Sequence, residues 1–495
     1  SLDVSFREYI PELPAWGDQV KLSHLVFHTS GIRDWVGTLT ISGWTQEDVM
    51  TQEHINQMAF DQEELVNPPG GRYDYSNTGW NLMGLVIERV TGQSLRSWLE
   101  ENLFQPLGMD ASLVRDDHTE VIPNRALGYK RGRQGFYRVT DNLMGVGSSS
   151  IRTTMEDLAR WYLNFDTHAV GGDEVFDVML NSKSVLDDGT VHFKRIAFDE
   201  GTYRGLPALT HAGIWAGFRH QFLLFPEDNM YFVVVSNYDG TRSNCRVRQV
   251  ADLFLDDILP EDEEGGGDQE DDDDGIGREL ESLPPERLAE YEGFYRLRRA
   301  RYAHVWRDGD SLLATETGED TVGFVPWRED LFVARDSIHY LAFRRNDEGE
   351  VHRLVAGVVN QYPCPAQDGF DYDVQRPEDW TSSPAGSNRR EYIPHPTVEE
   401  LTEFEGVFVS PELSTSYAVV LEEDRLVLRH KRHGTLPIIH AYRDEFKGTE
   451  WYTRAVNFRR NQAGEITGLV IDLGSRTRNL VFRKVDPASQ AYVPG

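Results

Sequence analysis

Two short polar motifs carry the residues of this sequence that could perform acid–base chemistry. The first holds Tyr75 and Asn77 within Asp-Tyr-Ser-Asn, and the second holds His211 two residues before Gly213. A tyrosine phenol can act as a base when neighbouring cations lower its pKa by several units from about 10. Asn77 offers a carbonyl and an amide, which could orient a lysine or a substrate amide. His211 offers a donor, and Gly213 would let a substrate approach the backbone closely.

The residues around these motifs predict the elements that hold them. A helix should follow Asn77, because apolar residues recur there at helical spacing, and Gly92 should end it. The face expected to be apolar consists of Trp80, Met83, Val86, Ile87 and Val90. His211 should lie on a strand edge, with further strands at 218–225 and 230–235. Neither motif is specific by itself, since Tyr-Ser-Asn is also a common turn tripeptide.

Two more helices are expected around these strands. The run Thr153-Thr154-Met155-Glu156 has the form of a capping box and leads into apolar residues, which predicts a helix start. A closing helix is expected at about 247–259. Residues 1 to about 258 should therefore form one domain of mixed helices and strands.

Longer runs around the motifs resemble the penicillin-recognising serine hydrolases, the β-lactamase-like family. They follow that family's order and are residues 25–32 (LVFHTSGI), 75–84 (YSNTGWNLMG), 106–109 (PLGM), 145–148 (GVGS) and 211–218 (HAGIWAGF). The resemblance covers residues 1 to about 258. It implies an α+β catalytic domain in which helices pack on an antiparallel sheet, as in β-lactamases and transpeptidases.

The same resemblance implies roles for the polar residues. Tyr75 is similar to the general base that shuttles the nucleophile's proton, and Asn77 to the residue that positions substrate and lysine. His211 stands where many members have the lysine of Lys-Thr-Gly. Because histidine is mostly neutral near pH 7, it anchors a substrate carboxylate less well than lysine does. The histidine variant is similar to D-aminopeptidases and esterases more than to true β-lactamases.

Three residues that follow His211 are expected to bind substrate. By the resemblance, Ile214 gives its N–H to the oxyanion hole, with Gly213 and Trp215 beside it. His28 and Ser30 look like a second polar pair, but the resemblance makes them structural. No cofactor is expected, and no histidine, aspartate and glutamate cluster has the spacing of metal ligands.

The family's nucleophile lies in a Ser-x-x-Lys motif, which this sequence lacks. No serine stands three residues before any lysine. By the resemblance, Ser1 corresponds to the point where the nucleophile helix has just ended, and the first two strands are also absent. The strand at 231–235 would then be an unprotected apolar edge, prone to aggregation. We therefore expect an incomplete copy of a longer hydrolase, inactive by itself.

Composition limits the partners of the chain. It has 495 residues, with 82 acidic and 50 basic side chains and a net charge of −32, so nucleic-acid binding is disfavoured. No run of apolar residues is long enough to span a membrane, and no signal peptide is visible at Ser1. The protein would be periplasmic or secreted if a signal peptide precedes Ser1, and cytoplasmic otherwise. Cys245 and Cys364 lie far apart and are expected to be two ordinary thiols.

The second half of the chain contains an internal repeat. Residues 286–295 match 399–408, and 343–346 match 458–461 at nearly the same offset. Short alternating segments with turn signals between them predict antiparallel strands, for example a hairpin at 419–428. Each copy has the size of a small closed barrel of the lipocalin-like kind. A catalytic domain followed by two barrels is similar to the D-aminopeptidase arrangement.

The predicted domains therefore follow one another along the chain. They are a hydrolase domain at 1–259, an acidic linker rich in Gly and Asp at 260–283, a first barrel at 284–386, a linker at 387–397 and a second barrel at 398–488. The predicted function is a serine hydrolase that cleaves a small peptide, amide or ester through an acyl-serine intermediate, of the D-aminopeptidase or esterase kind. The alternatives are an inactive protein that binds ligands or peptidoglycan fragments, and a β-lactamase or DD-carboxypeptidase.

Overall fold

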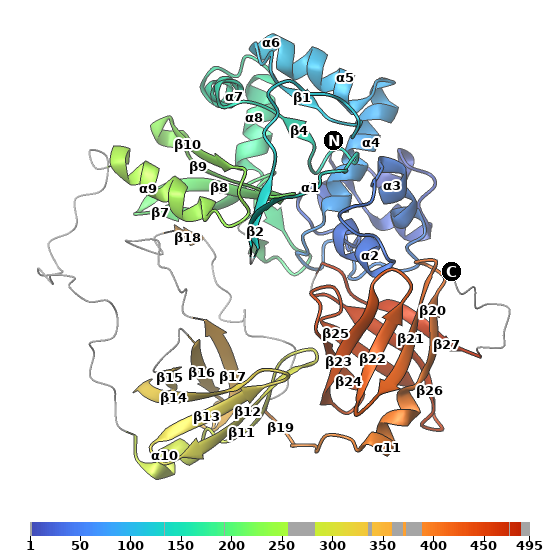
Figure 1. Ribbon diagram of the computed structural model, residues 1–495. Coiled ribbons are helices and arrows are strands. Elements are labelled where there is room, and N and C mark those ends of the chain that lie inside the picture. Colours follow the sequence, from blue (N-terminus) through green and yellow to red (C-terminus); the bar gives the residue numbers. More distant parts are fainter. Residues whose placement is uncertain are drawn as a thin grey trace, which may run out of the picture. The chain divides into compact units, whose positions relative to one another are not determined.

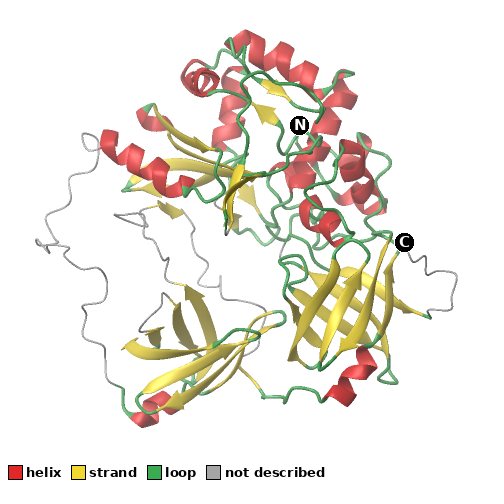
Figure 2. Ribbon diagram, in the orientation of Figure 1, coloured by secondary structure: helices red, strands yellow, loops and turns green. Residues whose placement is uncertain are grey.

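The computed structural model of the chain contains two compact units (Figure 1). The residues that it describes are 2–132, 134–192, 194–255, 283–334, 339–358, 370–372, 389–474 and 476–486. Nearly all of residues 2–255 belong to the first unit together with residues 370–372, and the second unit holds 283–358 and 389–486. Helices are concentrated in the first unit, whereas the second is built mainly of strands (Figure 2).

The first unit is an α+β domain, as predicted. Its helices are α1 (Leu22–Val26), α2 (Trp35–Ile41), α3 (Gln52–Phe60), α4 (Asn77–Thr91), α5 (Leu95–Leu99), α6 (Gln105–Leu107), α7 (Met155–Thr167), α8 (Gly172–Asn181) and α9 (Ser243–Leu255). Three two-stranded ribbons pair β1 (Leu113–Val114) with β4 (Ile151–Arg152), β2 (Tyr129–Gly132) with β3 (Gly135–Arg138), and β5 (Ser184–Val185) with β6 (Val191–His192). The main sheet contains β7 (Asp199–Tyr203), β8 (Leu206–Trp215), β9 (Phe218–Phe225), β10 (Met230–Ser236) and β18 (Phe370–Tyr372).

The main sheet lies between helices on both of its faces. Its strands are antiparallel in the order β10, β9, β8, β7 and β18. Apolar residues of α9, including Val247 and Ala251, pack on one face, and Figure 1 shows α9 crossing these strands. On the opposite face, aromatic residues of α7 and α8, such as Phe165 and Phe176, pack against Leu224. The predicted strands at 218–225 and 230–235 are thus confirmed, joined by the short turn Pro226–Asp228.

Strand β10 has β9 as its one neighbour among the described strands. The side chain of Val235 on β10 is 48% exposed, and Phe254 on the adjacent α9 is 61% exposed. Among the described strands β10 is thus an apolar strand paired on one side, which is the arrangement expected from the sequence; its tendency to aggregate stays a prediction.

Helix α4 begins at Asn77 and ends at Gly92, as predicted. Gly92 adopts the left-handed conformation that ends many helices, with φ of 72°. The predicted apolar face is partly wrong, because Val90 is 64% exposed while Leu82 and Asn81 are fully buried. The helix is turned so that small and polar residues also face the core. For α7 the cap is Thr154, whose hydroxyl accepts the Asp157 N–H, rather than Thr153 of the expected capping box.

The second unit consists of two eight-stranded antiparallel barrels, as predicted. The first contains α10 (Pro285–Ala289), β11 (Gly293–Arg298), β12 (Arg301–Asp308), β13 (Ser311–Glu316), β14 (Thr321–Arg328), β15 (Leu331–Ala334), β16 (His339–Arg345), β17 (Val351–Val358) and β19 (Arg389–Arg390). The second contains α11 (Val398–Leu401), β20 (Gly406–Ser410), β21 (Thr415–Glu422), β22 (Arg425–His430), β23 (Gly434–Tyr442), β24 (Glu445–Gly448), β25 (Ala455–Arg460), β26 (Ile466–Asp472) and β27 (Leu480–Val485).

The two barrels have the same strand order but differ in the strand that lies beside their first strand. In the second barrel each strand pairs with the next, and β20 pairs with β27 to close the barrel. In the first barrel β19 takes the corresponding place beside β11, while β18 pairs with β7 of the first unit. Strand β19 lies inside the segment that was expected to be the 387–397 linker.

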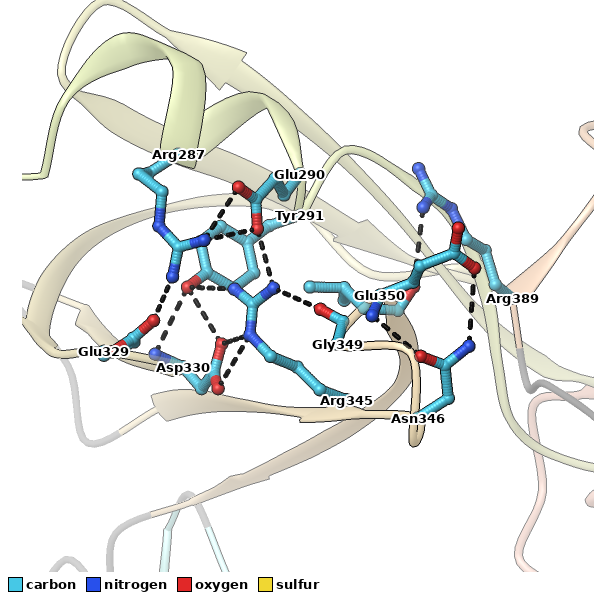
Figure 3. A network of polar contacts seen from close by, with 11 residues as sticks. Arg287, Glu290, Tyr291, Glu329, Asp330, Arg345, Asn346, Gly349, Glu350 and Arg389 are labelled. Atoms are coloured by element: carbon cyan, nitrogen blue, oxygen red, sulfur yellow. Dashed lines mark hydrogen bonds and ion pairs between the residues drawn. The ribbon is translucent and has the colours of Figure 1, made fainter.

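An arginine clamp explains part of the internal repeat. Arg345 of the first barrel contacts Glu290 at 2.7 Å and Asp330 at 3.0 Å, and it donates to the Gly349 carbonyl at 2.8 Å (Figure 3). The guanidinium therefore joins the entry helix, the β14–β15 turn and the β16–β17 turn. Tyr291 adds its hydroxyl, which donates to Asp330 at 2.9 Å.

The second barrel repeats this clamp. Arg460 contacts Glu403 at 3.0 Å and Asp444 at 3.0 Å, and it donates to the Gly464 carbonyl at 2.7 Å. The matched sequence blocks are thus the two ends of one network in each barrel. Each clamp ties a barrel's short entry helix to two turns, and charge-assisted contacts of this kind are among the stronger hydrogen bonds.

Two further sequence expectations concern the cysteines and the acidic linker. Cys245 is disulfide-bonded rather than a free thiol, which corrects that expectation; Cys364 lies outside the described residues. The acidic linker at 260–283 also lies outside the described residues, apart from Leu283. Within the part of the chain that the structure describes, no helix is both long and apolar enough to cross a membrane.

Candidate active site

The Tyr75-Ser76-Asn77 motif is held at the beginning of α4 by a buried carboxylate. The Asn77 backbone N–H and its side-chain amide both donate to Asp34 Oδ2, at 2.8 Å and 2.7 Å. Asp34 is 4% exposed, and its carboxylate accepts a backbone N–H at the beginning of α4. The N-terminus of a helix favours negative charge, so this position stabilises the carboxylate. With its amide fixed in this way, Asn77 presents its carbonyl oxygen to Tyr75, whose hydroxyl donates to it at 3.2 Å.

His28 fixes the plane of the Tyr75 ring. The two rings are stacked with centroids 4.2 Å apart and planes 25° apart. The Ser76 N–H lies 3.1 Å from His28 Nδ1, and the Trp80 indole nitrogen lies 3.3 Å from His28 Nε2. A neutral imidazole accepts at one nitrogen only, so one of these two contacts can be a hydrogen bond at a time. The family resemblance predicted a structural role for His28, and the structure places its ring directly against Tyr75, the candidate base.

His211 lies on β8, just beyond the residues of that strand that pair with β7. It pairs with Phe222 of β9. The pairing of β8 with β7 ends at Thr210, so at His211 β9 is the one partner strand among the described strands. Burial, and after it the positive charge of Lys194, lower the pKa of His211 to about 4. The imidazole is therefore neutral at neutral pH and offers hydrogen bonds rather than a charge.

Gly213 makes room for a side chain of the protein rather than for a substrate. It pairs with His220 on β9, and a Cβ at Gly213 would lie 2.5 Å from His220 Nδ1 and closer still to two other ring atoms. The expectation that Gly213 leaves an open approach to the backbone is therefore wrong, because the His220 imidazole covers that position. Burial lowers the pKa of His220 to about 4, with a further contribution from His211.

Ile214 and Trp215 end β8 in different environments. The side chain of Ile214 is 67% exposed. The Trp215 indole donates to Asp141 Oδ1 at 3.0 Å, and its ring lies 5.7 Å from that of Trp35. Trp215 thus anchors the β8–β9 hairpin to the loop that carries Asp141, and it is not among the residues that line the cavity described next.

A cavity of about 280 Å³ brings the two motifs together. It is lined by His28, Tyr75, Trp80, Gly147, Ser148, Trp161, Tyr162, Met179, Lys194, Arg195, Ala197, Phe198, His211 and Phe222. The predicted glycine loop contributes Gly147 and Ser148, and the Ser148 hydroxyl donates to Asn81 of α4 at 2.9 Å. Gly147 has φ of 105°, and a Cβ there would lie 3.0 Å from the Asn81 Cα, so glycine permits this close approach.

The cations of this cavity could not be found from the sequence. Lys194 is 8% exposed at its side chain and pairs with Asp199, while Arg195 pairs with Glu200. The Lys194 ammonium also lies 5.8 Å from the centre of the Tyr73 ring. Neither residue belongs to a motif, and the chain places both beside the site just before β7. Each is matched by a carboxylate, so together the two pairs add little net charge.

The β-lactamase family model matches residues 1–255 of the chain, more than half of its length. The chain belongs to the beta-lactamase family. The match covers the first unit, including Tyr75, Asn77 and His211, and membership indicates a serine hydrolase or peptidase class.

Several curated relatives match the same half of the chain at low identity. A D-aminopeptidase of Gluconobacter oxydans is 22% identical over 240 residues, which are 48% of this chain and 45% of that protein. Penicillin-binding protein 4* of Bacillus subtilis is 24% identical over 249 residues, 46% of this chain and 53% of that protein. The chain therefore spans about half the length of these relatives.

Solved structures give similar matches. An octameric penicillin-binding protein homologue from Pyrococcus abyssi has a TM-score of 0.48 and 21% identity, covering 72% of this chain and 82% of its own. A D-amino acid amidase from Ochrobactrum anthropi has a TM-score of 0.41 and 20% identity, covering 48% and 70%.

Proposed function

We propose that the protein is a hydrolase of amide bonds, of the D-aminopeptidase kind, whose substrate enters the cavity of the first unit. The observation that carries the proposal is that Tyr75 and His211, from motifs far apart in the sequence, line one cavity with Ser148 of the glycine loop. Family membership and the D-aminopeptidase relatives support the reaction class.

In this proposal Tyr75 is the general base and Asn77 orients it. The Asp34 carboxylate holds the Asn77 amide, and the Asn77 carbonyl receives the Tyr75 hydroxyl. A phenolate at neutral pH requires net positive charge nearby, because the ordinary pKa of tyrosine is about 10. Lys194 and Arg195 line the cavity but are already paired with carboxylates. A further cation is therefore needed before Tyr75 can accept a proton.

His211 would bind the substrate as a neutral group. Its depressed pKa keeps it uncharged, so it can orient a carbonyl or amide but gives a terminal carboxylate little attraction. This property favours amides of amino acids over substrates recognised through a carboxylate. The N–H of Ile214 is proposed as an oxyanion donor, next to Gly213 and Trp215.

The missing nucleophile divides this proposal into two parts. No Ser-x-x-Lys motif occurs in the 495 residues, so we propose that this chain binds substrate without acylation. A fluorophosphonate probe should leave it unlabelled. If the gene also encodes Ser-x-x-Lys, the longer protein should be labelled and should hydrolyse D-alanine p-nitroanilide faster than nitrocefin. Faster nitrocefin hydrolysis would contradict the role given to His211.

Two tyrosines of one loop provide a matched pair of variants. In an active longer protein, Tyr75→Phe should lower kcat by about a hundredfold or more, as expected for loss of a general base. Tyr73→Phe removes the same atom from a ring that stacks on His192 and does not line the cavity, so it should leave kcat nearly unchanged. Equal losses in both variants would rule out Tyr75 as the base.

The second candidate function is a binding protein that retains the cleft without the reaction. These 495 residues contain the cavity and no Ser-x-x-Lys motif. Saturable binding of D-alanine amide by the longest natural form, without burst or turnover, would support this candidate over the hydrolase.

A further inference from the structure

A second cavity lies in the second unit, where strands of the two barrels meet. Its volume is about 350 Å³. It is lined by Arg296, Arg299, Tyr302, Arg390, Tyr442, Arg443, Asp444, Glu445, Asn457 and Phe458. Four arginines thus face two carboxylates in a protein whose net charge is −32. Such a local excess of cations in an acidic chain calls for a physical reason.

Glu445 is fully engaged by the protein and is the partner of one of these arginines. Its Oε1 contacts Arg296 at 2.8 Å. Its Oε2 accepts the Tyr302 hydroxyl at 2.9 Å and the Ala300 N–H at 3.0 Å. These contacts join the first barrel to β24 of the second, beside a small buried cluster that includes Tyr302 and Ala441. Glu445 is therefore a structural link across the junction of the barrels.

The other acidic groups near the cavity are also matched. Asp444 belongs to the arginine clamp and contacts Arg460 at 2.9 Å. Asp472, which is 6% exposed at its side chain, pairs with Arg299. Arg296 and Arg299 of the cavity therefore each have a carboxylate partner in the protein.

Two polar groups of the cavity have capacity for a ligand. Arg443 is exposed on the β23–β24 turn, with φ of 50°, and its guanidinium lies 5.3 Å from the Tyr442 ring without a carboxylate partner among the described residues. Asn457 donates to Asp472 at 3.3 Å, while its buried Oδ1 has no hydrogen-bond partner among the described residues. A buried acceptor left unpaired is costly, so a donor from a ligand would be stabilising.

The internal repeat shows that this cation is particular to the second barrel. The clamp residues Asp330 and Asp444 occupy equivalent turns, each accepting from an equivalent arginine. The residue before Asp330 is Glu329, whereas the residue before Asp444 is Arg443. Both barrels keep the clamp although one has Glu329 and the other Arg443 at this position. The positive charge of Arg443 is therefore not needed to close the second barrel.

We propose that this cavity is a binding site for a small organic anion. The ligand carries a carboxylate or a similar oxyanion that contacts Arg443, and beside it an O–H or N–H that donates to Asn457 Oδ1. An acidic sugar has both groups, and the stacked rings of Tyr302 and Tyr442, 5.0 Å apart, form the apolar wall for its ring. This site is separate from the hydrolase proposal and does not depend on it.

Calorimetric titration of the whole chain tests the proposal. The probes are D-glucuronate, which has both groups, sulfate, which has an oxyanion without a donor, and D-glucose, which lacks the charge. D-Glucuronate should bind best, and D-glucose should give no signal. Arg443→Asn, which tolerates the left-handed backbone, should weaken D-glucuronate about tenfold or more. Arg425→Asn replaces an exposed arginine of the same barrel outside the cavity and should bind like the parent.

A second variant separates the two contacts. Asn457→Ala should weaken D-glucuronate but leave the affinity for sulfate unchanged. The proposal is overturned if D-glucuronate gives no heat at millimolar concentration, if D-glucose binds equally well, or if Arg443→Asn and Arg425→Asn have the same effect. Thermal unfolding of each variant identifies any loss of binding that follows from loss of folding.

Discussion

The packing of His220 over Gly213 can be tested by adding one methyl group. In Gly213→Ala the new Cβ would lie 2.5 Å from His220 Nδ1 and closer to Cε1 and Nε2, so the whole ring must move. The His220 ring also packs against the ring of Phe222 on the same strand, with the two ring centres 5.0 Å apart. Overpacking of this kind costs about 1–3 kcal/mol of unfolding free energy.

The same substitution should have the opposite sign once the ring is removed. Alanine within a strand is favoured over glycine by roughly 0.5–1 kcal/mol, because glycine loses more backbone entropy on folding. In a His220→Ala background, Gly213→Ala should therefore be neutral or slightly stabilising. The coupling between the two positions is then about 2–3 kcal/mol, at the upper end of values for residues in contact.

Urea unfolding of the parent, the two single variants and the double variant measures this coupling. The slope of each transition should stay constant, so that the midpoint reports the free energy. The reasoning would be refuted if Gly213→Ala destabilised the chain equally with and without the His220 ring. A matched readout is the NMR signal of the His211 ring, whose environment should change in Gly213→Ala because the displaced His220 lies beside it.

Two further predictions follow from burial and close approach. The pKa values of His192, His211 and His220 are lowered to about 4, so the unfolded chain binds more protons than the folded one below pH 6.5. The contribution of these three histidines to the free energy of unfolding should therefore be fully present above about pH 6.5 and should be lost as the pH is lowered toward 4. Replacing all three by glutamine should make the free energy of unfolding depend less on pH in this range. An unchanged pH dependence in that variant would contradict the prediction. Gly128→Ala would place a Cβ 3.0 Å from the Ala216 carbonyl carbon and closer to its oxygen. Because the backbone at Ala216 cannot move aside easily, this variant should lower the free energy of unfolding by about 3 kcal/mol in the same urea assay. A free energy equal to that of the parent within error would show that the two loops are not in contact.

The sequence predicts best the features that depend on neighbouring residues. The strands around 218–225 and 230–235 and the end of α4 at Gly92 follow from local pattern and backbone preference. The α+β domain with two barrels follows from the order of family motifs and from the repeat. The arginine clamp explains why those particular blocks repeat, because it joins the entry helix of each barrel to two separate turns.

The predicted site is brought together, but its surroundings could not be predicted. Tyr75 and His211 line one cavity, as the motif order implied. The sequence contains no signal that Asp34 would orient Asn77 or that His28 would stack on Tyr75. These contacts join segments whose spacing along the chain carries no fixed geometry.

By itself, the sequence determined the family, the order of the elements and the absence of Ser-x-x-Lys. These properties reside in residue types and short-range spacing, which hold whatever the chain packs against. Only the tertiary structure decided that Gly213 is covered by His220, that Lys194 enters the cavity, and that Arg443 and Asn457 share a second cavity. The reason is that strand pairing and burial set which side chains meet, and with them the charge and pKa of each group.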